Sequence, residues 1–194
     1  MAKFKQDQLL EEMLSRSTAM TRAATVLVEG LSSEQWNFKP SPAAWSMAQV
    51  IEHLTLTNGP YLEGAIARLS QSGNPSSTGD FRSGWLGELF YRRLQPGDGG
   101  RIKPAPAPGF LRPSESTINP AAAWQKFLDQ QAQLEAVIRQ AAGVNLNLVK
   151  IPSAISKLLK FPLGDVLRIV VAHNDRHLLQ MQRIKRALNE NEAR

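Results

Sequence analysis

The chain has 194 residues, of which 42% are hydrophobic, so it can bury one substantial core and does not need a second domain. It contains no cysteine, which excludes a disulfide scaffold, thiolate metal ligands and a cysteine nucleophile of its own. The net charge of +6 raises the question of a nucleic-acid partner, but the basic residues are dispersed and no nucleic-acid-binding motif is present. We therefore expect a single domain over residues 1–194 and do not favour a nucleic-acid partner.

The N-terminal residues lead directly into a charged amphipathic pattern, without the apolar segment of a signal peptide or a stretch of membrane-spanning length. This predicts a cytoplasmic protein with no membrane partner. From Leu10 to Leu31, apolar and small residues recur every three or four positions. That spacing predicts a first helix, which we expect to stop near Gly30.

A linker that contains residues 32–36 and two prolines precedes the second predicted helix. Ser46 is followed three positions later by Gln49, which is the pattern of a capping box. The helix should therefore begin at Ser46 and continue to Leu69. Pro60 allows a kink within it.

Residues 72–118 are rich in Gly, Pro and Ser, and only the segment 81–90 has aromatic residues spaced as in a short helix. A connection of about 45 residues is too long for a hairpin and favours a crossover that leaves the second and third long helices parallel. The proline-rich run 104–108 is expected to form an extended surface strap with little packing of its own.

The third long helix is expected to begin with Asn119 as its N-cap and Pro120 in its first turn, and to end at Gly143. Residues 144–159 are ambiguous, because they suit a short extended piece followed by one or two helical turns. The last helix should start near Pro162. Four amphipathic helices and no convincing strand pair predict an all-α four-helix bundle.

The last helix carries the sharpest chemical signal. His173 and His177 lie on the same apolar seam as Val166, Val170 and Met181, so both imidazoles should point into the bundle. Residues four apart on a helix have Cβ atoms about 6 Å apart, which lets two ring nitrogens reach one ion.

His53 lies at the edge of the apolar stripe of the second helix. If that helix neighbours the last one, His53 completes a set of three neutral nitrogens that leaves metal positions open to water or substrate, as catalytic sites do. Alternatively, each histidine is a core residue that bonds a carbonyl or hydroxyl group, and for His53 alone this is the better explanation. For all three together we favour a metal, because clustered imidazoles without one would each need a separate partner.

The segment from Trp45 to Leu54 resembles the helix-two signature of the DinB-like (damage-inducible) superfamily, and the segment from Val171 to His177 resembles its C-terminal metal motif. The order, the separation and the His-x-x-x-His spacing match, and the resemblance covers essentially the whole chain. It implies a four-helix bundle with up-down-down-up topology, often a homodimer. It also implies a divalent metal, zinc or nickel first and iron or manganese next, held by His53, His173 and His177.

Characterised members of this superfamily include metal-dependent transferases that use a low-molecular-weight thiol such as bacillithiol or mycothiol, among them a maleylpyruvate isomerase. The resemblance therefore implies an S-transferase acting on a small-molecule substrate, in which the metal binds the thiol and favours its thiolate form. The positive charge of the chain would help to attract an anionic cosubstrate.

Three alternatives stay open: a non-catalytic metal- or ligand-binding protein of the stress response, a metal-dependent hydrolase, and a basic helical protein that binds nucleic acid. For the hydrolase, Ser153 and Ser156 are only weak candidates, because no nucleophile-elbow pattern surrounds them.

Polar neighbours of the histidines are candidates for orienting a ring, although an exposed position is the better interpretation for each. They are Glu52, Asn58, Asn174, Asp175 and Gln180. Aromatic residues are candidates for lining a substrate pocket, although core packing is the better interpretation for them as a group. They are Trp36, Trp45, Tyr61, Trp85 and Trp124.

Overall fold

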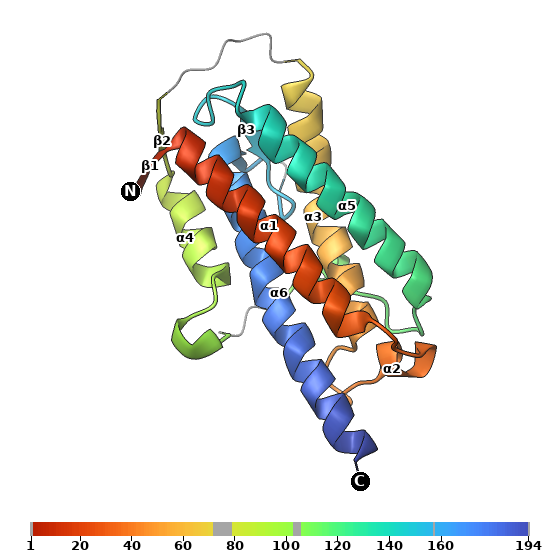
Figure 1. Ribbon diagram of the computed structural model, residues 1–194. Coiled ribbons are helices and arrows are strands. Elements are labelled where there is room, and N and C mark those ends of the chain that lie inside the picture. The colour runs from red at the N-terminus through yellow and green to blue at the C-terminus, as the bar shows by residue number, and fades with distance from the viewer. Residues whose placement is uncertain (1, 72–78, 103–105, 157, 194) are drawn as a thin grey trace.

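The computed structural model describes residues 2–71, 79–102, 106–156 and 158–193. Within these residues the chain is mostly helical, as the sequence predicts. The four long helices are α1 (Gln6–Val28), α3 (Met47–Leu69), α5 (Pro120–Ala141) and α6 (Leu163–Glu192), and the two shorter ones are α2 (Ser33–Asn37) and α4 (Trp85–Leu94) (Figure 1). Short 3₁₀ turns, η1 and η2, span Asp98–Gly100 and Gly109–Leu111.

Each long helix packs against two others. α1 contacts α5 and α6, and α3 contacts the same two helices from the other side. Figure 1 shows that α1 and α6 run in one direction, whereas α3 and α5 run in the opposite one. α3 and α5 are therefore parallel neighbours, which is possible because a long crossover carries the chain back between them.

The predicted starts of the other three long helices are confirmed, whereas α1 begins at Gln6, four residues before the predicted Leu10. Ser46 and Gln49 form a complete capping box at the beginning of α3, and the side chain of Asn119 accepts a hydrogen bond from the backbone at the beginning of α5. Pro162 is the N-cap of α6. Gly30 follows the end of α1 with a φ of 72°, a conformation that favours glycine and ends the helix.

Two clusters of buried apolar side chains form the core. One includes Tyr61 of α3 and Val170 of α6, and the other includes Leu54 of α3 and Met181 of α6. Both helices pass from one cluster to the other. His173 and His177 lie between Val170 and Met181, and His53 directly precedes Leu54, so the three histidines lie near the place where the two clusters meet.

The prediction that the fold has no strand pair is wrong. β1 (Lys3–Lys5) pairs antiparallel with β2 (Asp80–Arg82), and β3 (Lys150–Pro152) pairs antiparallel with β4 (Lys160–Pro162). Each strand has three residues and points one side chain inward, so no alternating pattern is long enough to detect.

Two loop predictions also need correction. Residues 33–37 form a helix of their own, α2, with a capping box between Ser32 and Gln35 that the linker interpretation overlooked. In the segment 144–159 the extended piece is present as β3, but the expected helical turns are absent from the residues that the structure describes there. The segment turns back through β4 instead, which places Leu163 at the beginning of α6.

In the described part of the chain, no helix has both the length and the hydropathy of a membrane span.

Candidate metal centre

Three histidines from two helices meet at one point. His53 lies in the second turn of α3, and His173 and His177 lie one turn apart in α6. The Nε2 atom of His173 is 3.3 Å from Nε2 of His53 and 3.0 Å from Nε2 of His177. One ligand atom from each ring lies within 4.8 Å of the others. Packing of α3 against α6 thus brings together residues 120 positions apart in the chain.

The outer nitrogens of two rings face strong acceptors. Nδ1 of His53 lies 2.7 Å from the carbonyl oxygen of Leu111, and Nδ1 of His177 lies 2.9 Å from Oε1 of Gln180. Because a carbonyl oxygen only accepts, Nδ1 of His53 must carry the ring proton. With the Gln180 oxygen in this orientation, the same holds for His177. The inner Nε2 atom of each neutral ring therefore keeps its lone pair.

The third ring has a longer contact. Nδ1 of His173 lies 3.4 Å from Oγ1 of Thr57, whose hydroxyl donates to the carbonyl oxygen of His53 at 2.8 Å. The hydroxyl oxygen thus offers a lone pair to Nδ1 of His173. With all three Nδ1 atoms protonated, three lone pairs face one another at the centre of the cluster, an arrangement that a cation between them would stabilise.

Burial keeps the rings neutral. It lowers the pKa of His177 to about 3, with a further contribution from His53. Burial, followed by the charges of the other two rings, holds the pKa of His173 well below its ordinary value. Burial also lowers the pKa of His53, although the hydrogen bond to Leu111 opposes the shift. At neutral pH the rings are therefore in the unprotonated form that a metal requires.

The spacing of the nitrogens is compatible with one ion. Two nitrogens bonded to the same ion at about 2.1 Å lie roughly 3.0 to 3.4 Å apart when the angle between the bonds is about 90 to 109°. Both contacts of His173 fall in this range. The residues present therefore fit a divalent metal, and a set of imidazoles suits zinc, nickel or iron better than magnesium or calcium.

Trp45 forms a wall beside the cluster. Its ring lies 4.8 Å from the ring of His53 and 6.3 Å from that of His177, measured between centroids. Trp45 directly precedes Ser46, the N-cap of α3. The capping box that starts the helix thereby also holds the indole against the histidines.

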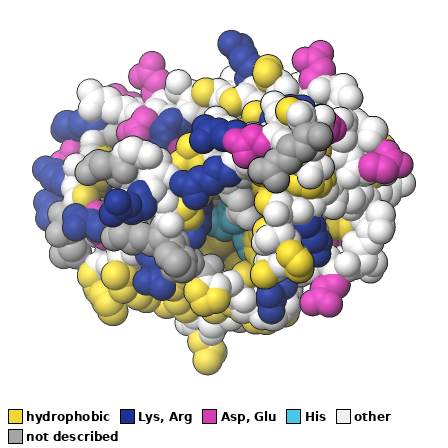
Figure 2. Space-filling view, turned by 90° about the horizontal axis from the view of Figure 1, so that it is seen from below, with side chains coloured by type: hydrophobic (Ala, Val, Ile, Leu, Met, Phe, Trp, Pro, Cys, Tyr) yellow, Lys and Arg dark blue, Asp and Glu magenta, His cyan; other side chains and the backbone are white. Residues whose placement is uncertain are grey.

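All three histidines line a cavity of about 670 Å³. Figure 2 looks into a hollow in the surface, with histidine at the bottom and Lys and Arg side chains around the opening. The walls come from α3, α4, α6 and the segments around Leu111 and Ile155. His173 is half-buried, whereas His53 and His177 are buried, so a small molecule in the cavity can reach the cluster.

The aromatic candidates separate into three groups. Trp45 and Tyr61 line the cavity, and both also pack in the core, Tyr61 as a buried residue and Trp45 as a partly buried one. Trp36 and Trp124 pack against each other with ring centroids 5.9 Å apart, as core residues do. Trp85 is 71% exposed and does neither.

Among the polar neighbours, Gln180 orients a ring, so its expected exposed role is wrong. The amides of Asn58 and Asn174 bond each other at 2.9 Å, and Asn174 donates to Gln131 at 3.1 Å. Asn58 and Asn174 are buried, so the exposed positions expected for them are wrong. Asn58 also lines the cavity, but among the described residues no hydrogen bond joins these amides to a histidine. The visible role of this chain of amides is to hold α3, α5 and α6 in register.

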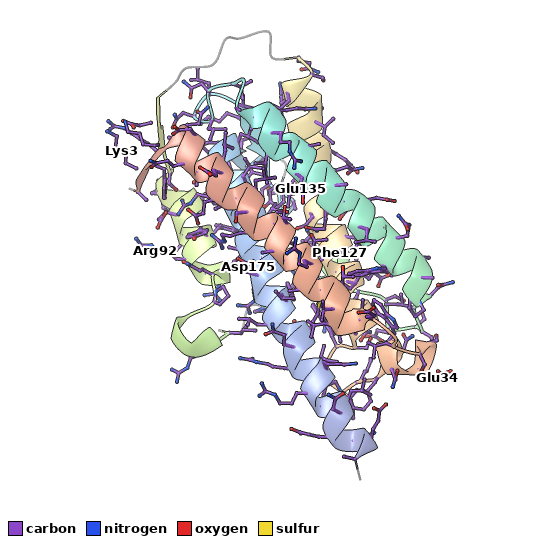
Figure 3. The ribbon with its side chains drawn as sticks, in the orientation of Figure 1. Lys3, Glu34, Arg92, Phe127, Glu135 and Asp175 are labelled. Carbon is purple, nitrogen blue, oxygen red and sulfur yellow. The ribbon has the colours of Figure 1, made fainter. Side chains whose placement is uncertain are left out.

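The two acidic neighbours face away from the cavity. Asp175 lies on the side of α6 toward α1, as Figure 3 shows, where it accepts a 2.6 Å hydrogen bond from Arg16. Glu52 accepts a hydrogen bond from the backbone of Ser114 at 2.6 Å. Both carboxylates therefore bind neighbouring segments of the chain, and neither orients a histidine ring.

Leu111 and Thr57 were missed as partners of the histidines. Leu111 acts through its backbone carbonyl, so its side chain carries no signal. Thr57 does carry a sequence signal, because it follows His53 by four residues on the same helix and lies on the same face.

Two further predicted features also lie near the cavity. Of the expected strap 104–108, Pro104 and Ala105 lie outside the described residues, but Pro106, Ala107 and Pro108 line the cavity, so this part does pack. The hydroxyl of Ser153 lies 3.3 Å from that of Tyr61, and Ser156 is exposed. Within the described structure, neither serine is bonded to a histidine.

Comparison with known proteins gives one match. The model of the DinB superfamily matches residues 14–181, a range that contains all three histidines. No curated protein and no solved structure matches the chain.

Proposed function

We propose that this chain, which belongs to the DinB superfamily, is a metal-dependent enzyme that transfers a low-molecular-weight thiol to an electrophilic small molecule. One observation carries the proposal. One ring nitrogen of each of three imidazoles lies within 4.8 Å of the other two, at the wall of a cavity large enough for a small substrate.

The proposed metal ligands are Nε2 of His53, His173 and His177. The hydrogen bonds of their Nδ1 atoms support this assignment, because they leave each inner nitrogen free to donate its lone pair. The proposed ion is zinc or nickel, with iron or manganese as the next candidates.

A bound divalent cation would supply a Lewis acid that lowers the pKa of a thiol within its reach. The chain contributes the surroundings: Leu111 and Gln180 hold the ring tautomers, and Trp45 shields two rings from water. The transfer forms a bond between the thiol sulfur and an electrophilic carbon. The leaving group departs with the bonding pair, and the thiol proton passes to solvent.

We further propose that residues 1–194 form one domain whose four long helices are an up-down-down-up bundle. The parallel course of α3 and α5 and the contacts of each with α6 or α1 support this arrangement. A cytoplasmic location and a homodimer stay predictions from the sequence.

Metal analysis of protein purified without a histidine tag tests the site. We expect about one transition-metal ion per chain, and loss of most of it in the His173→Ala variant. Gln182→Ala is the matched control, because this glutamine is exposed on the same helix. Equal metal content in wild type and His173→Ala would remove the basis for the proposal.

Incubation of the metal-loaded protein with several thiols and chlorodinitrobenzene tests the reaction. We expect conjugation at a rate that depends on the metal and falls in His173→Ala. A protein that binds metal but accelerates conjugation with none of the thiols would instead be a non-catalytic metal- or ligand-binding protein.

A further inference from the structure

Two arginines line the cavity beside the histidines. Arg176 lies next to His177 on α6 and is 7% exposed, whereas Arg93 is exposed on α4. The histidines and these arginines therefore line one cavity from three helices, α3, α4 and α6. A buried guanidinium inside a cavity and an exposed one at its edge make a cationic path from solvent to the histidine cluster.

The charge of the cavity lining is one-sided. Of the described residues that line it, none is Asp or Glu, and Arg93 and Arg176 are the charged ones at neutral pH. The acidic neighbours Glu52 and Asp175 bond elsewhere. A divalent cation held by neutral imidazoles would add two further positive charges, so the lined space becomes strongly favourable for an anion.

The two guanidinium groups act on each other and on the cluster. Burial, followed by the charge of Arg93, lowers the pKa of Arg176. The charge of Arg176 in turn helps to lower the pKa of each of the three histidines. Arginine stays charged under these conditions, so an anion bound between the two side chains would relieve their repulsion.

The remaining walls are mostly apolar. They include Phe90, Leu94, Ile155, Ile169 and Val170. A small inorganic anion would leave these surfaces without a partner. An organic molecule with an apolar body and a carboxylate would use both the apolar walls and the guanidinium groups.

We propose that the cavity binds an apolar carboxylate, with Arg176 and Arg93 as the groups that bind its carboxylate. The identification of this molecule as a reactant rests on the proposed function, but its binding does not. The carboxylate belongs either to the electrophile or to the thiol. In both cases Arg176 and Arg93 determine specificity and take no part in bond making.

Calorimetric titration of the metal-free protein with naphthoate and with naphthamide tests the binding. The two probes share an aromatic body and differ in the carboxylate. We expect naphthoate to bind roughly tenfold or more tightly than naphthamide, because a charge-assisted bond to guanidinium is lost in the amide. Equal affinity for the two probes would overturn the inference, whatever the metal content of the protein.

Arg176→Gln and Arg93→Gln should each reduce naphthoate affinity and leave naphthamide affinity unchanged. Arg186→Gln is the matched control, since it removes the same charge from an exposed position of α6 outside the cavity lining. Arg93 is exposed, so its substitution tests the inference even if Arg176→Gln fails to fold. If all three substitutions lower naphthoate affinity equally, the arginines act only through the net charge of the protein, and the proposal is contradicted.

The source of the carboxylate follows from kinetics with the metal-loaded protein. One arm compares chloronitrobenzoate with chloronitrobenzamide as the electrophile, and the other compares mercaptopropionate with mercaptoethanol as the thiol. We expect Arg93→Gln to raise KM for the carboxylate in one arm with little change in kcat. If KM changes in neither arm of an active enzyme, the arginines do not bind a reactant. If no conjugation occurs at all, the proposed function fails while the naphthoate titration still decides the binding.

Discussion

Two buried polar clusters lie along α6, and they differ in what surrounds them. Near the start of the helix, Arg168 contacts Glu88 at 2.9 Å and Asp165 at 3.6 Å, and donates to Ser83 at 2.9 Å. Its guanidinium also lies over the ring of Tyr91. In this cluster, charge meets opposite charge and the space is filled.

The histidine cluster, two turns later on the same helix, satisfies its outer nitrogens but not its inner ones. Its Nε2 atoms face one another and the cavity, with no acidic group among the described residues that line it. A polar cluster whose groups all bond one another stabilises the packing of the elements it joins. A cluster whose lone pairs face a cavity can instead bind a ligand. The two clusters should therefore respond differently to substitution.

The largest expected effect is on the closed cluster. Replacing Arg168 with Met leaves the carboxylate of Asp165 buried without its cation, so we expect a loss of about 3 to 5 kcal/mol in the free energy of unfolding. Denaturant titration measures it. Arg92→Ala is the control, because the Arg92 side chain is 74% exposed and Glu88 keeps its ion pair with Arg168, so stability should change by less than about 1 kcal/mol. Similar losses in both variants would contradict the comparison.

Packing around the closed cluster provides a second test. A Cβ atom on Gly87 would lie 2.2 Å from the carboxyl group of Asp165, so Gly87→Ala must displace a buried charge. We expect a loss of about 1 to 3 kcal/mol, measured by thermal unfolding. Gly109→Ala should have almost no effect, because a Cβ atom there meets nothing within 4 Å. An unchanged melting temperature for Gly87→Ala would show that this region is loosely packed.

The open cluster should be sensitive in metal affinity more than in stability. Gln180→Ala removes the acceptor from Nδ1 of His177 and should weaken metal binding by about 10- to 100-fold. Competition with a chelator measures the affinity. The exposed Gln182→Ala should bind metal as the wild type does, and if Gln180→Ala does the same, the proposed tautomer control is wrong.

The smallest expected effect is the change in the free energy of unfolding of the metal-free protein over a single pH unit. Because the pKa of His177 is about 3 when folded, below the ordinary value of 6.5, the unfolded chain takes up protons first as the pH falls. Stability is therefore complete above about pH 6.5 and should fall below it by up to about 1.4 kcal/mol per pH unit for each histidine. Unfolding curves between about pH 3 and pH 6.5 measure how steeply the free energy of unfolding depends on pH. This dependence should be weaker in His177→Ala. An equal dependence would show that His177 is not its cause.

The predictability of the fold differs between long and short elements. Ser46, Asn119 and Pro162 could be assigned from the sequence as helix starts, because capping acts within a few residues of the chain. The three-residue strands could not, since their pairing joins segments such as Lys3–Lys5 and Asp80–Arg82 that lie far apart. Their single inward side chains leave no repeating pattern.

The candidate site shows the same division. The spacing of His173 and His177 within one helix indicates by itself that the two rings share a face. The carbonyl of Leu111 as partner of His53, and the presence of Arg93 of α4 and Arg176 of α6 in one cavity, depend on how distant segments pack. Neither a backbone carbonyl nor a lone arginine produces a pattern in the sequence.

The sequence by itself therefore determined the four long helices, most of their ends and which residues had the chemistry to bind a metal, because those properties arise within a few turns of the chain. Only the tertiary structure decided that His53 joins the other two rings, which groups hold their protons, and that a cationic, mostly apolar cavity lies beside them. These features arise where α3, α4 and α6 meet, and such contacts between distant residues are set by packing of the whole molecule.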